Sequence, residues 1–372
     1  MLYFWFPKVE DLKVLLSKNT LKTAVVILNW NGKQHLEKYL PDVVEHTALL
    51  NNDIYVADNG STDDSIMFLY QSYPQIKIIQ LDKNYGFAGG YNQALKQVEA
   101  DIFCLLNSDV RVTEDWLNAP LEIFEKYSDI AAVQPKILSD RDLSRFEHAG
   151  AAGGFIDKYG YPFCRGRIMN IIEYDKGQYN SQSDIFWASG ACLFIRSEVF
   201  HSQGGFDDDY FAHMEEIDLC WRLKNQGLRV VYCPKSKVFH YGGATLDYNN
   251  PHKLYLNFRN SLWTLYKNYT GKYLCFTMFK RMLIDTTAIL KFAASFDIKN
   301  AMAIFKAHMA FHASRRNIVE KRKKLMAKVT CRQHDEILPL SIVLCFFLKG
   351  RKTFHSLKKF RTKNLLKSKR LF

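Results

Sequence analysis

Residues 23–32, TAVVILNWNG, decide how this chain folds. The first six form an uninterrupted apolar run rich in β-branched side chains, which predicts a strand buried on both faces, as the strands of parallel sheets are. Residues 29–32 then turn the chain, and residues 35–50 have the pattern of a helix. A buried strand, a polar turn and a helix together make the first half of a βαβ unit.

The same order repeats further along the chain. Short apolar runs at residues 53–57, 77–80 and 101–106 predict three more strands, and helical patterns separate them. This alternation predicts an α/β fold with a mostly parallel central sheet flanked by helices. Beyond residue 115 the segments become shorter and irregular, with strands expected at residues 130–135, 186–195 and 229–233.

Polar residues follow the predicted strands, at Asn29, Asp58, Asn84 and Asp109. Ligands of open α/β sheets bind at the carboxyl ends of the strands, so these side chains are expected to line one site. Asp58 can accept hydrogen bonds from a base or a ribose, and a carboxylate such as Asp109 can hold Mg²⁺ or Mn²⁺ against a diphosphate. Each position also has a simpler explanation, because Asn and Asp are common in tight turns.

An acidic segment stands at residues 211–222, FAHMEEIDLCWR, just before a helical pattern. Glu215 and Asp218 are spaced i, i+3 and share one helix face, whereas Glu216 points about 100° away. Helix-dipole stabilisation alone would explain acidic side chains in a first turn. The apolar stripe of the same helix faces the core, so at least one of the carboxylates is expected to face a cleft or solvent.

Three other features are candidates for ligand contacts. The loop at residues 86–90, GFAGG, lets backbone approach a diphosphate, although it lacks the GxGxxG spacing. His240 ends a late strand and offers an imidazole to a cation such as Mn²⁺. Trp187 and Gly190 are placed to wall a pocket. A plain turn, a structural histidine and a packed strand are the respective alternatives.

Composition describes a globular body with a basic end. The 372 residues are 48% hydrophobic, which supplies a sizeable core and excludes global disorder. The net charge is +13, but residues 314–372 hold 18 Lys/Arg and 3 Asp/Glu, so the preceding residues are nearly neutral. We divide the chain into a lead-in at residues 1–22, an α/β domain at 23–250 and a helical, basic region at 251–372.

The remaining features of the whole sequence indicate the cellular compartment. Eight cysteines show no CxxC or other metal-type spacing, which suits reduced thiols in the cytosol. The first residues lack the basic and long apolar stretches of a signal peptide. The longest apolar run, residues 338–348, has about half of the ~20 residues that a spanning helix needs. We therefore expect neither a signal peptide nor a transmembrane segment.

Taken in order, seven segments resemble the family 2 glycosyltransferases of the GT-A fold, and among them the bacterial rhamnosyltransferase-like branch. The segments are VVILNWNG, VADNGSTDDS, NYGFAGGYN, LLNSDV, SGACLFIRSEVF, GGFDDDYFAHMEEIDLCWRL and VFHYGG. The resemblance covers residues 23–245, and the ordered set is far more specific than any one segment. It implies that the predicted sheet is the central sheet of the GT-A fold, the fold of nucleotide-diphospho-sugar transferases.

The resemblance also implies roles for individual residues. Donor contacts would come from the following side chains and glycines: Asn29, Asp58, Asn84, Gly86, Asn107, Asp109, Trp187 and Gly190. Residues 107–109 would be the DxD-type motif, with Asn107 in its first position, Asp109 as principal metal ligand and His240 as the later one. Glu215 and Glu216 occupy the place of the Glu-Asp pair, and the second position favours Glu216 as base. Asp218 would contact the acceptor or support the helix start.

The implied reaction is inverting transfer of a sugar, with rhamnose the expectation, from a nucleoside-diphosphate donor to a hydroxyl of a cell-surface glycan or lipid-linked acceptor. A divalent cation, Mg²⁺ or Mn²⁺, would assist. The basic clusters and apolar runs of the C-terminal region favour binding to an anionic membrane surface. The protein would then be cytoplasmic, peripheral at the inner face of the bacterial membrane. No nucleic-acid motif occurs, so we expect no nucleic-acid partner.

Two other function classes fit the same fold. A sugar nucleotidyltransferase would need a Gly-rich loop with Arg or Lys after the first strand, where this chain has NWNGKQH. A non-catalytic nucleotide-sugar-binding protein would be expected to lose Asp109 or the glutamate pair, and both are present.

Overall fold

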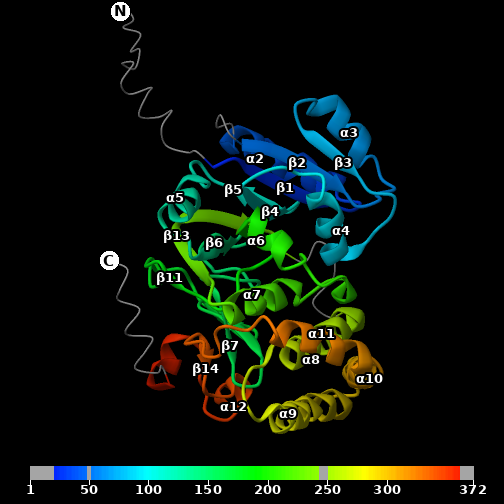
Figure 1. Cartoon of the computed structure of the whole chain (residues 1–372), viewed down its shortest axis with the longest axis vertical. Coiled ribbons are helices and arrows are strands. Elements are labelled where there is room, and N and C mark those ends of the chain that lie inside the picture. The colour runs from blue at the N-terminus through cyan, green and yellow to red at the C-terminus, as the bar shows by residue number, and fades with distance from the viewer. Residues whose placement is uncertain (1–20, 48–51, 243–249, 361–372) are drawn as a thin grey trace, which may run out of the picture.

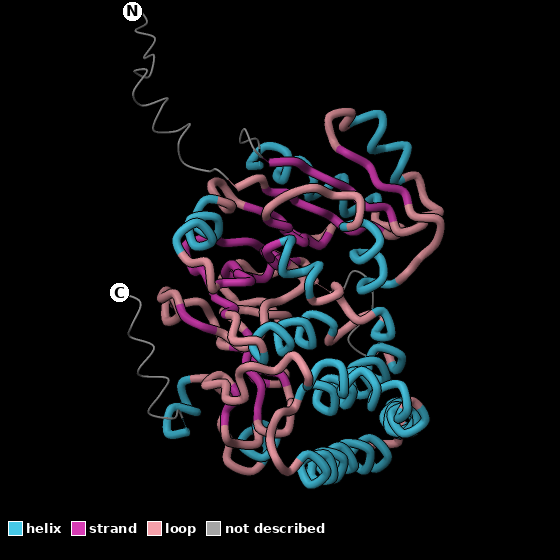
Figure 2. The backbone as a smooth tube through the Cα atoms, in the orientation of Figure 1, coloured by secondary structure: helices cyan, strands magenta, loops and turns pink. Residues whose placement is uncertain are grey.

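The computed structural model describes residues 21–47, 52–242 and 250–360 (Figure 1). The expected lead-in falls outside this part of the chain except for its last two residues. The central sheet, the helices that cover it and a second, smaller sheet are arranged along the long axis of the molecule, with the C-terminal helices at one end (Figure 2).

Nine strands form the central sheet in the part of the chain that the structure describes. β3 (Lys77–Gln80), β2 (Asn52–Asp58), β1 (Thr23–Asn29) and β4 (Ile102–Asn107) are parallel neighbours, as the buried apolar runs predicted. β12 (Cys192–Arg196) then runs antiparallel to β4 and to β6 (Ile130–Ser139). β13 (Arg229–His240) is parallel to β6, while β5 (Val110–Val112) and β11 (Ser183–Asp184) pair with it in antiparallel fashion.

The register of these strands places the polar strand ends side by side. Asn29 pairs with Asp58 across β1 and β2, and Leu28 pairs with Asn107 across β1 and β4. The antiparallel β5–β13 pair sets Val110 opposite His240, which brings the residue before Val110 to the same place. Side chains from four distant parts of the sequence therefore meet at one edge of the sheet.

Helices cover both faces of the sheet. The helices of this part are α2 (Lys33–Thr47), α3 (Ser65–Ser72), α4 (Gly86–Leu95), α5 (Asn118–Lys126), α6 (Ser197–Ser202) and α7 (Glu215–Asn225), with a short 3-10 helix, η1, at Asp208–Tyr210. Successive residues of β1 enter different apolar layers: Ala24 and Val26 join one, Val25 and Ile27 the other. This two-sided burial is why β1 is apolar throughout its length.

The second sheet lies beyond the central one and contains a strand from the C-terminal region. Its order is β10 (Ile171–Ile172), β9 (Arg167–Ile168), β8 (Pro162–Cys164), β7 (Gly154–Asp157) and β14 (Ile337–Leu338). The strand expected at residues 186–195 is shorter than predicted, because only Cys192–Arg196 pairs with the central sheet. Residues 186 and 187 instead lie beside β7, and Trp187 forms an isolated bridge with Gly154 of that strand.

The region after residue 250 is mainly helical and shares a hydrophobic core with the preceding α/β domain. Its elements are α8 (Pro251–Asn268), α9 (Leu274–Ala294), α10 (Ile298–Ala313), α11 (Arg315–Met326), α12 (Ile342–Phe347) and a 3-10 helix, η2, at His355–Phe360. One apolar layer runs from β1 through α7 into α8 and on to Leu338. A buried ion pair joins Lys224 of α7 to Glu336, with 2.8 Å between the charged atoms. None of the described helices is long and apolar enough to cross a membrane.

Candidate functional site

Asn29 and Asp58 are buried together at the ends of β1 and β2. The Asn29 amide donates to Asp58 Oδ2 over 3.1 Å, and the backbone N–H of Ser61 donates to Asp58 Oδ1 over 2.9 Å. Asp58 therefore takes part in a tight turn, which was the simpler reason for an Asp at this position. Asn29 Oδ1 is buried without a partner among the described residues, which marks an acceptor aimed at something the protein itself does not supply.

Asn59 connects this turn to the glycine-rich loop. Its amide donates to Asn84 Oδ1 over 3.1 Å and to the Gly86 carbonyl over 2.9 Å, and its own Oδ1 accepts the Tyr85 N–H. Asn84 in turn accepts the Gly86 N–H over 2.8 Å. No local sequence pattern indicated that Asn59 connects two loops, although it directly follows Asp58.

Gly86 has a different place from the one expected for a diphosphate-binding loop. The N–H groups of Phe87 and Ala88, at the start of α4, both donate to the carbonyl of Phe211. Gly86 has φ +73°, and a Cβ there would lie 2.5 Å from that carbonyl oxygen. The loop therefore holds the segment before α7, and its first amides are not free for a diphosphate. This placement argues against the predicted direct donor contact of Gly86.

The segment that α4 holds is strained. Phe211, His213 and Met214 all have φ between 63° and 74°, a region that residues other than glycine seldom adopt. The buried Asn260 of α8 stabilises this path, because its amide lies 2.8–3.1 Å from the carbonyls of residues 210, 212 and 213. Nothing in the sequence pointed to Asn260, which lies outside the predicted α/β domain.

The strained segment delivers Glu215 and Glu216 to the first turn of α7. Glu215 is buried, Glu216 is partly buried, and each has a carboxylate oxygen without a partner in the described chain. Burial, and then the charge of Glu216, raise the pKa of Glu215 well above its usual range. Burial also raises the pKa of Glu216 to about 7, against the opposing effect of backbone N–H groups at the helix start. Both shifts favour the neutral carboxyl groups, and the Glu216 pKa near neutrality suits a group that exchanges a proton.

Asp218 faces the interior instead. It is fully buried and pairs with Arg222 and Lys267, with 3.0 Å between charged atoms in both cases. Tyr210 and Asn268 donate further hydrogen bonds to it. Burial alone would raise the pKa of Asp218, but the two cations outweigh burial and hold it below its usual range. Asp218 joins α7 to α8, which argues against the predicted acceptor contact.

A second group of ionisable residues lies at the ends of β4 and β13. His240 Nε2 is 3.1 Å from Asp109 Oδ1, its Nδ1 is 3.5 Å from Glu147 Oε2, and all three residues are buried. The Asn107 amide lies 3.4 Å from His240 Nε2. Asp109 also accepts the N–H of Gly242 through Oδ2. Asn107, Asp109 and His240 therefore lie together, as expected. Glu147 also belongs to this group, and no local sequence pattern indicated it.

The charged forms of these residues stabilise one another. Burial disfavours every ionised form, yet the Asp109 and Glu147 carboxylates raise the pKa of His240 well above its usual range. His240 in turn lowers the pKa of Asp109 and of Glu147, against the same effect of burial. Such a compact acid–imidazole group is typical of sites that bind charged ligands.

Asp109 and His240 suit a divalent cation that also binds phosphate. A carboxylate and an imidazole are ligands that Mn²⁺ accepts, and Glu147 lies where a carboxylate can orient the imidazole from behind. No group of three or more His, Cys, Asp or Glu is arranged as a metal site within the described residues. Two protein ligands are nevertheless the usual number for a cation that takes its other oxygens from a diphosphate and water.

Trp187 and Gly190 have packing partners in the structure. The Trp187 ring lies against Gly154, its indole N–H donates to the Phe155 carbonyl over 3.0 Å, and the side chain is 3% exposed. A Cβ at Gly190 would approach the Phe87 ring to 2.9 Å. The structure gives both residues a role in the core, and their predicted donor contact finds no support in these contacts.

These features define a nucleotide-sugar transferase of the GT-A fold. The model of the family named Glycosyl transferase family 2 matches residues 24–203. Residues 24–203 therefore form a domain of that family, and the chain is a glycosyltransferase.

The relatives agree with this assignment. The chain is 28% identical over 233 residues to an N-acetylglucosaminyl-diphospho-decaprenol L-rhamnosyltransferase of Mycobacterium tuberculosis, covering 58% of this chain and 75% of the relative. It is 27% identical over 235 residues to the rhamnosyltransferase WbbL of Escherichia coli, covering 58% and 82%. Among solved structures, GalNAc-T7 with UDP, GalNAc and Mn²⁺ superposes with a TM-score of 0.53 at 15% identity, over 68% of this chain and 49% of that one. At that identity the superposition supports the fold alone.

Proposed function

We propose that this protein transfers a sugar, with inversion, from a nucleoside-diphosphate donor to a hydroxyl of a lipid-linked glycan, using Glu216 as the base. The observation that carries the proposal is the partly buried Glu216 at the start of α7, with an unpartnered carboxylate oxygen and a pKa raised to about 7. A base poised near the working pH is what proton removal from a sugar hydroxyl requires.

The proposed step is a single displacement. The acceptor oxygen attacks the anomeric carbon from the face opposite the diphosphate, Glu216 takes the hydroxyl proton, and the bond from the anomeric carbon to the diphosphate oxygen breaks. Glu215, whose raised pKa favours the protonated form, is suited to donate a hydrogen bond to one of the substrates. Holding both substrates in one site supplies much of the remaining acceleration.

Asp109 and His240 are the residues that would hold a divalent cation. When bound, such a cation neutralises the negative charge that grows on the departing diphosphate. Glu147 keeps the His240 ring in place, and Asn107 lies beside it. Asn29 and Asp58 are proposed to contact the nucleoside, because Asn29 Oδ1 lacks a partner among the described residues and lies next to the Asp58 carboxylate.

The sugar and the acceptor are proposed from the relatives. Two of them are named as rhamnosyltransferases, and one of these names a diphospho-decaprenol acceptor. We extend both to this chain as rhamnose and a polyprenyl-diphosphate-linked glycan. Such an acceptor resides in a membrane, so we place the protein at the cytoplasmic face.

An anionic membrane surface is the partner proposed for the C-terminal region. Support comes from α9, which exposes Phe276, Phe279, Leu283 and Leu290 among lysines. The basic clusters contribute unevenly. Lys321 forms ion pairs with Asp207 and Asp209, whereas Lys323 and Lys324 are exposed. The side chains of the cluster at residues 358–361 lie outside the described part of the chain.

A nucleotide-sugar panel tests the proposal. Thermal shifts with and without Mn²⁺ identify the donor, and release of its nucleoside diphosphate is then followed for the natural protein and for Asp109→Ala. The proposal expects cation-dependent release that drops at least 100-fold in Asp109→Ala. Stabilisation by a donor without any release, with or without acceptor, would instead favour a binding protein.

A further inference from the structure

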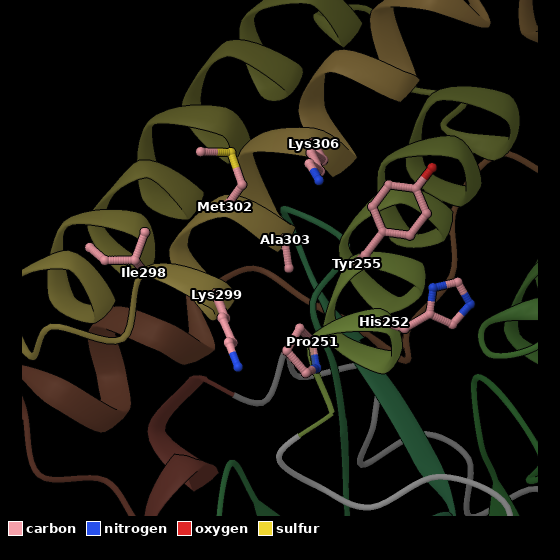
Figure 3. A pocket seen from close by; sticks show the side chains of 8 residues that line it. All are labelled: Pro251, His252, Tyr255, Ile298, Lys299, Met302, Ala303 and Lys306. Carbon is pink, nitrogen blue, oxygen red and sulfur yellow. The ribbon is translucent and has the colours of Figure 1, made fainter.

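A cavity of about 610 Å³ lies between the start of α8 and the first half of α10 (Figure 3). Figure 3 shows His252 and Tyr255 on the α8 side and the residues of α10 on the other. Its walls include His252, Tyr255, Ile298, Lys299, Met302 and Lys306. A volume of this size and a largely apolar lining with a few polar groups are typical of ligand sites.

The charge around the cavity is positive. Lys299 and Lys306 form no ion pair within the described residues, and no acidic side chain lines the walls. Both bordering helices also begin here, since α8 starts at Pro251 and α10 at Ile298. Asp297 already caps α10 by accepting the N–H of Asn300, so the attraction for an anion comes from the start of α8 and from the two lysines.

An apolar stripe leads away from the cavity along α10. Ile298, Met302, Phe305 and Met309 are spaced four, three and four residues apart, so they share one helix face. Their side chains are 57%, 45%, 50% and 55% exposed. A contiguous exposed apolar face of this kind marks a binding surface for an apolar partner or a lipid.

The cavity is also connected to the proposed catalytic segment. α8 contributes Tyr255 and His252 to the cavity, and through Asn260 it holds the carbonyls of residues 210, 212 and 213. Burial lowers the pKa of His213 to about 4, and the positive charges of Lys253 and His252 add to this effect. The first turn of α8 therefore lies close enough to act on the residue two positions before Glu215.

We propose that this cavity binds the phosphate end of the lipid-linked acceptor, with Lys299 and Lys306 pairing with the phosphate and the stripe from Ile298 to Met309 lying along the lipid chain. This inference rests on the proposed function, because it names where that function's acceptor enters. A polyprenyl diphosphate matches both halves of the site, since it joins an anion to an apolar chain.

The test measures binding of farnesyl diphosphate, a short prenyl diphosphate, to the full chain by calorimetry. The double variant Lys299→Glu/Lys306→Glu is compared with Lys280→Glu/Lys291→Glu, which changes the net charge equally on α9, away from the cavity lining. The proposal expects at least a tenfold loss of affinity in the first variant and less than a twofold loss in the second. Equal losses, or none, would overturn it.

Two further probes separate the sources of the anion and of the lipid. Inorganic pyrophosphate should bind at least tenfold more weakly than farnesyl diphosphate, because it lacks the chain that the apolar stripe contacts. Vesicles of phosphatidylglycerol test the bilayer itself. If the cavity variant loses vesicle binding but keeps its farnesyl diphosphate affinity, the lysines contact phospholipid headgroups and the acceptor site is refuted.

The failure of this inference can be told apart from failure of the proposed function. Acceptor-independent release of nucleoside diphosphate from the donor should be unchanged in Lys299→Glu/Lys306→Glu, while the KM for a lipid-linked acceptor rises at least tenfold. A natural protein that hydrolyses no nucleotide sugar would refute the function, whereas unchanged farnesyl diphosphate binding in the variant would refute the cavity alone.

Discussion

Replacing Glu216 by Gln tests the proposed base directly. Gln keeps the size of the side chain and removes only its charge and basicity. Loss of a general base costs roughly 10²–10⁴ in turnover, so we expect a fall of that size in kcat. Donor affinity should stay within about threefold, because the side chain is assigned to the acceptor hydroxyl and not to the nucleotide.

The same substitution should stabilise the protein above neutral pH. Burial shifts the Glu216 pKa from 4.5 to about 7, and at about 1.36 kcal/mol per unit this costs about 3 kcal/mol when the carboxylate is ionised. The folded-state pKa is the raised one, so the penalty is absent below pH 4.5 and grows until the pH passes 7. Glu216→Gln should therefore raise the melting temperature by about 5 °C at pH 8 and barely change it at pH 5.

Two assays check this reasoning. Nucleoside diphosphate release in the presence of acceptor gives kcat, and thermal melting at pH 5 and pH 8 gives the stability change. For the natural protein, kcat/KM should rise as the pH increases through about 7, the pKa of Glu216. Turnover of Glu216→Gln within threefold of the natural protein would remove Glu216 from the mechanism. A melting temperature that falls at pH 8 would mean that the carboxylate is not the strained, desolvated group described above.

Two substitutions probe the residues that hold Glu216 in place. Asp218→Asn should destabilise the fold by about 3–5 kcal/mol, seen as a lower denaturation midpoint, because it leaves Arg222 buried without its carboxylate and Lys267 with Asp207 alone; an unchanged midpoint would contradict the ion-pair role. Gly86→Ala should lower kcat at least tenfold, because its Cβ would meet the carbonyl that α4 binds. Gly204→Ala is its control, since Gly204 has a similar φ of +77° and nothing within 4 Å of its Cβ, so equal effects of the two would show that backbone strain alone matters.

The parallel part of the sheet was predictable because its signals are local. Each of β1, β2 and β4 is an apolar run that ends in a polar turn. In a domain of this size, such a run indicates a strand that is buried on both faces of a sheet. The polar residues at the strand ends followed from the same pattern. Asp109 and His240 were expected to meet, and the β5–β13 pairing brings them within 3.1 Å.

The features of the site that could not be predicted depend on contacts between residues far apart in sequence. Asp218 looks like a site carboxylate until Lys267, from a helix beyond the predicted domain boundary, is placed beside it. Asn260 and Glu147 have no local pattern, because their roles come from three carbonyls and one imidazole that the tertiary fold brings to them. Trp187 was assigned to a strand that begins only at Cys192, and its ring lies against Gly154 of the second sheet instead.

The glycine-rich loop shows why a residue type does not identify its ligand. Gly86 needs its positive φ and its missing Cβ, as the sequence indicated. The group that approaches so closely is the carbonyl of Phe211, and not a diphosphate. The loop fixes the segment that presents Glu216, the base that we propose.

The anomeric configuration of the product tests the central claim most directly. With the donor found in the nucleotide-sugar panel and a short prenyl-diphosphate-linked glycan as acceptor, the glycosylated product is examined by ¹H NMR before any mutarotation is possible. A single displacement with Glu216 as base predicts that the new bond has the configuration opposite to that of the donor. Retention of the donor configuration would contradict the account, because it requires either two displacements or a departure and attack on the same face.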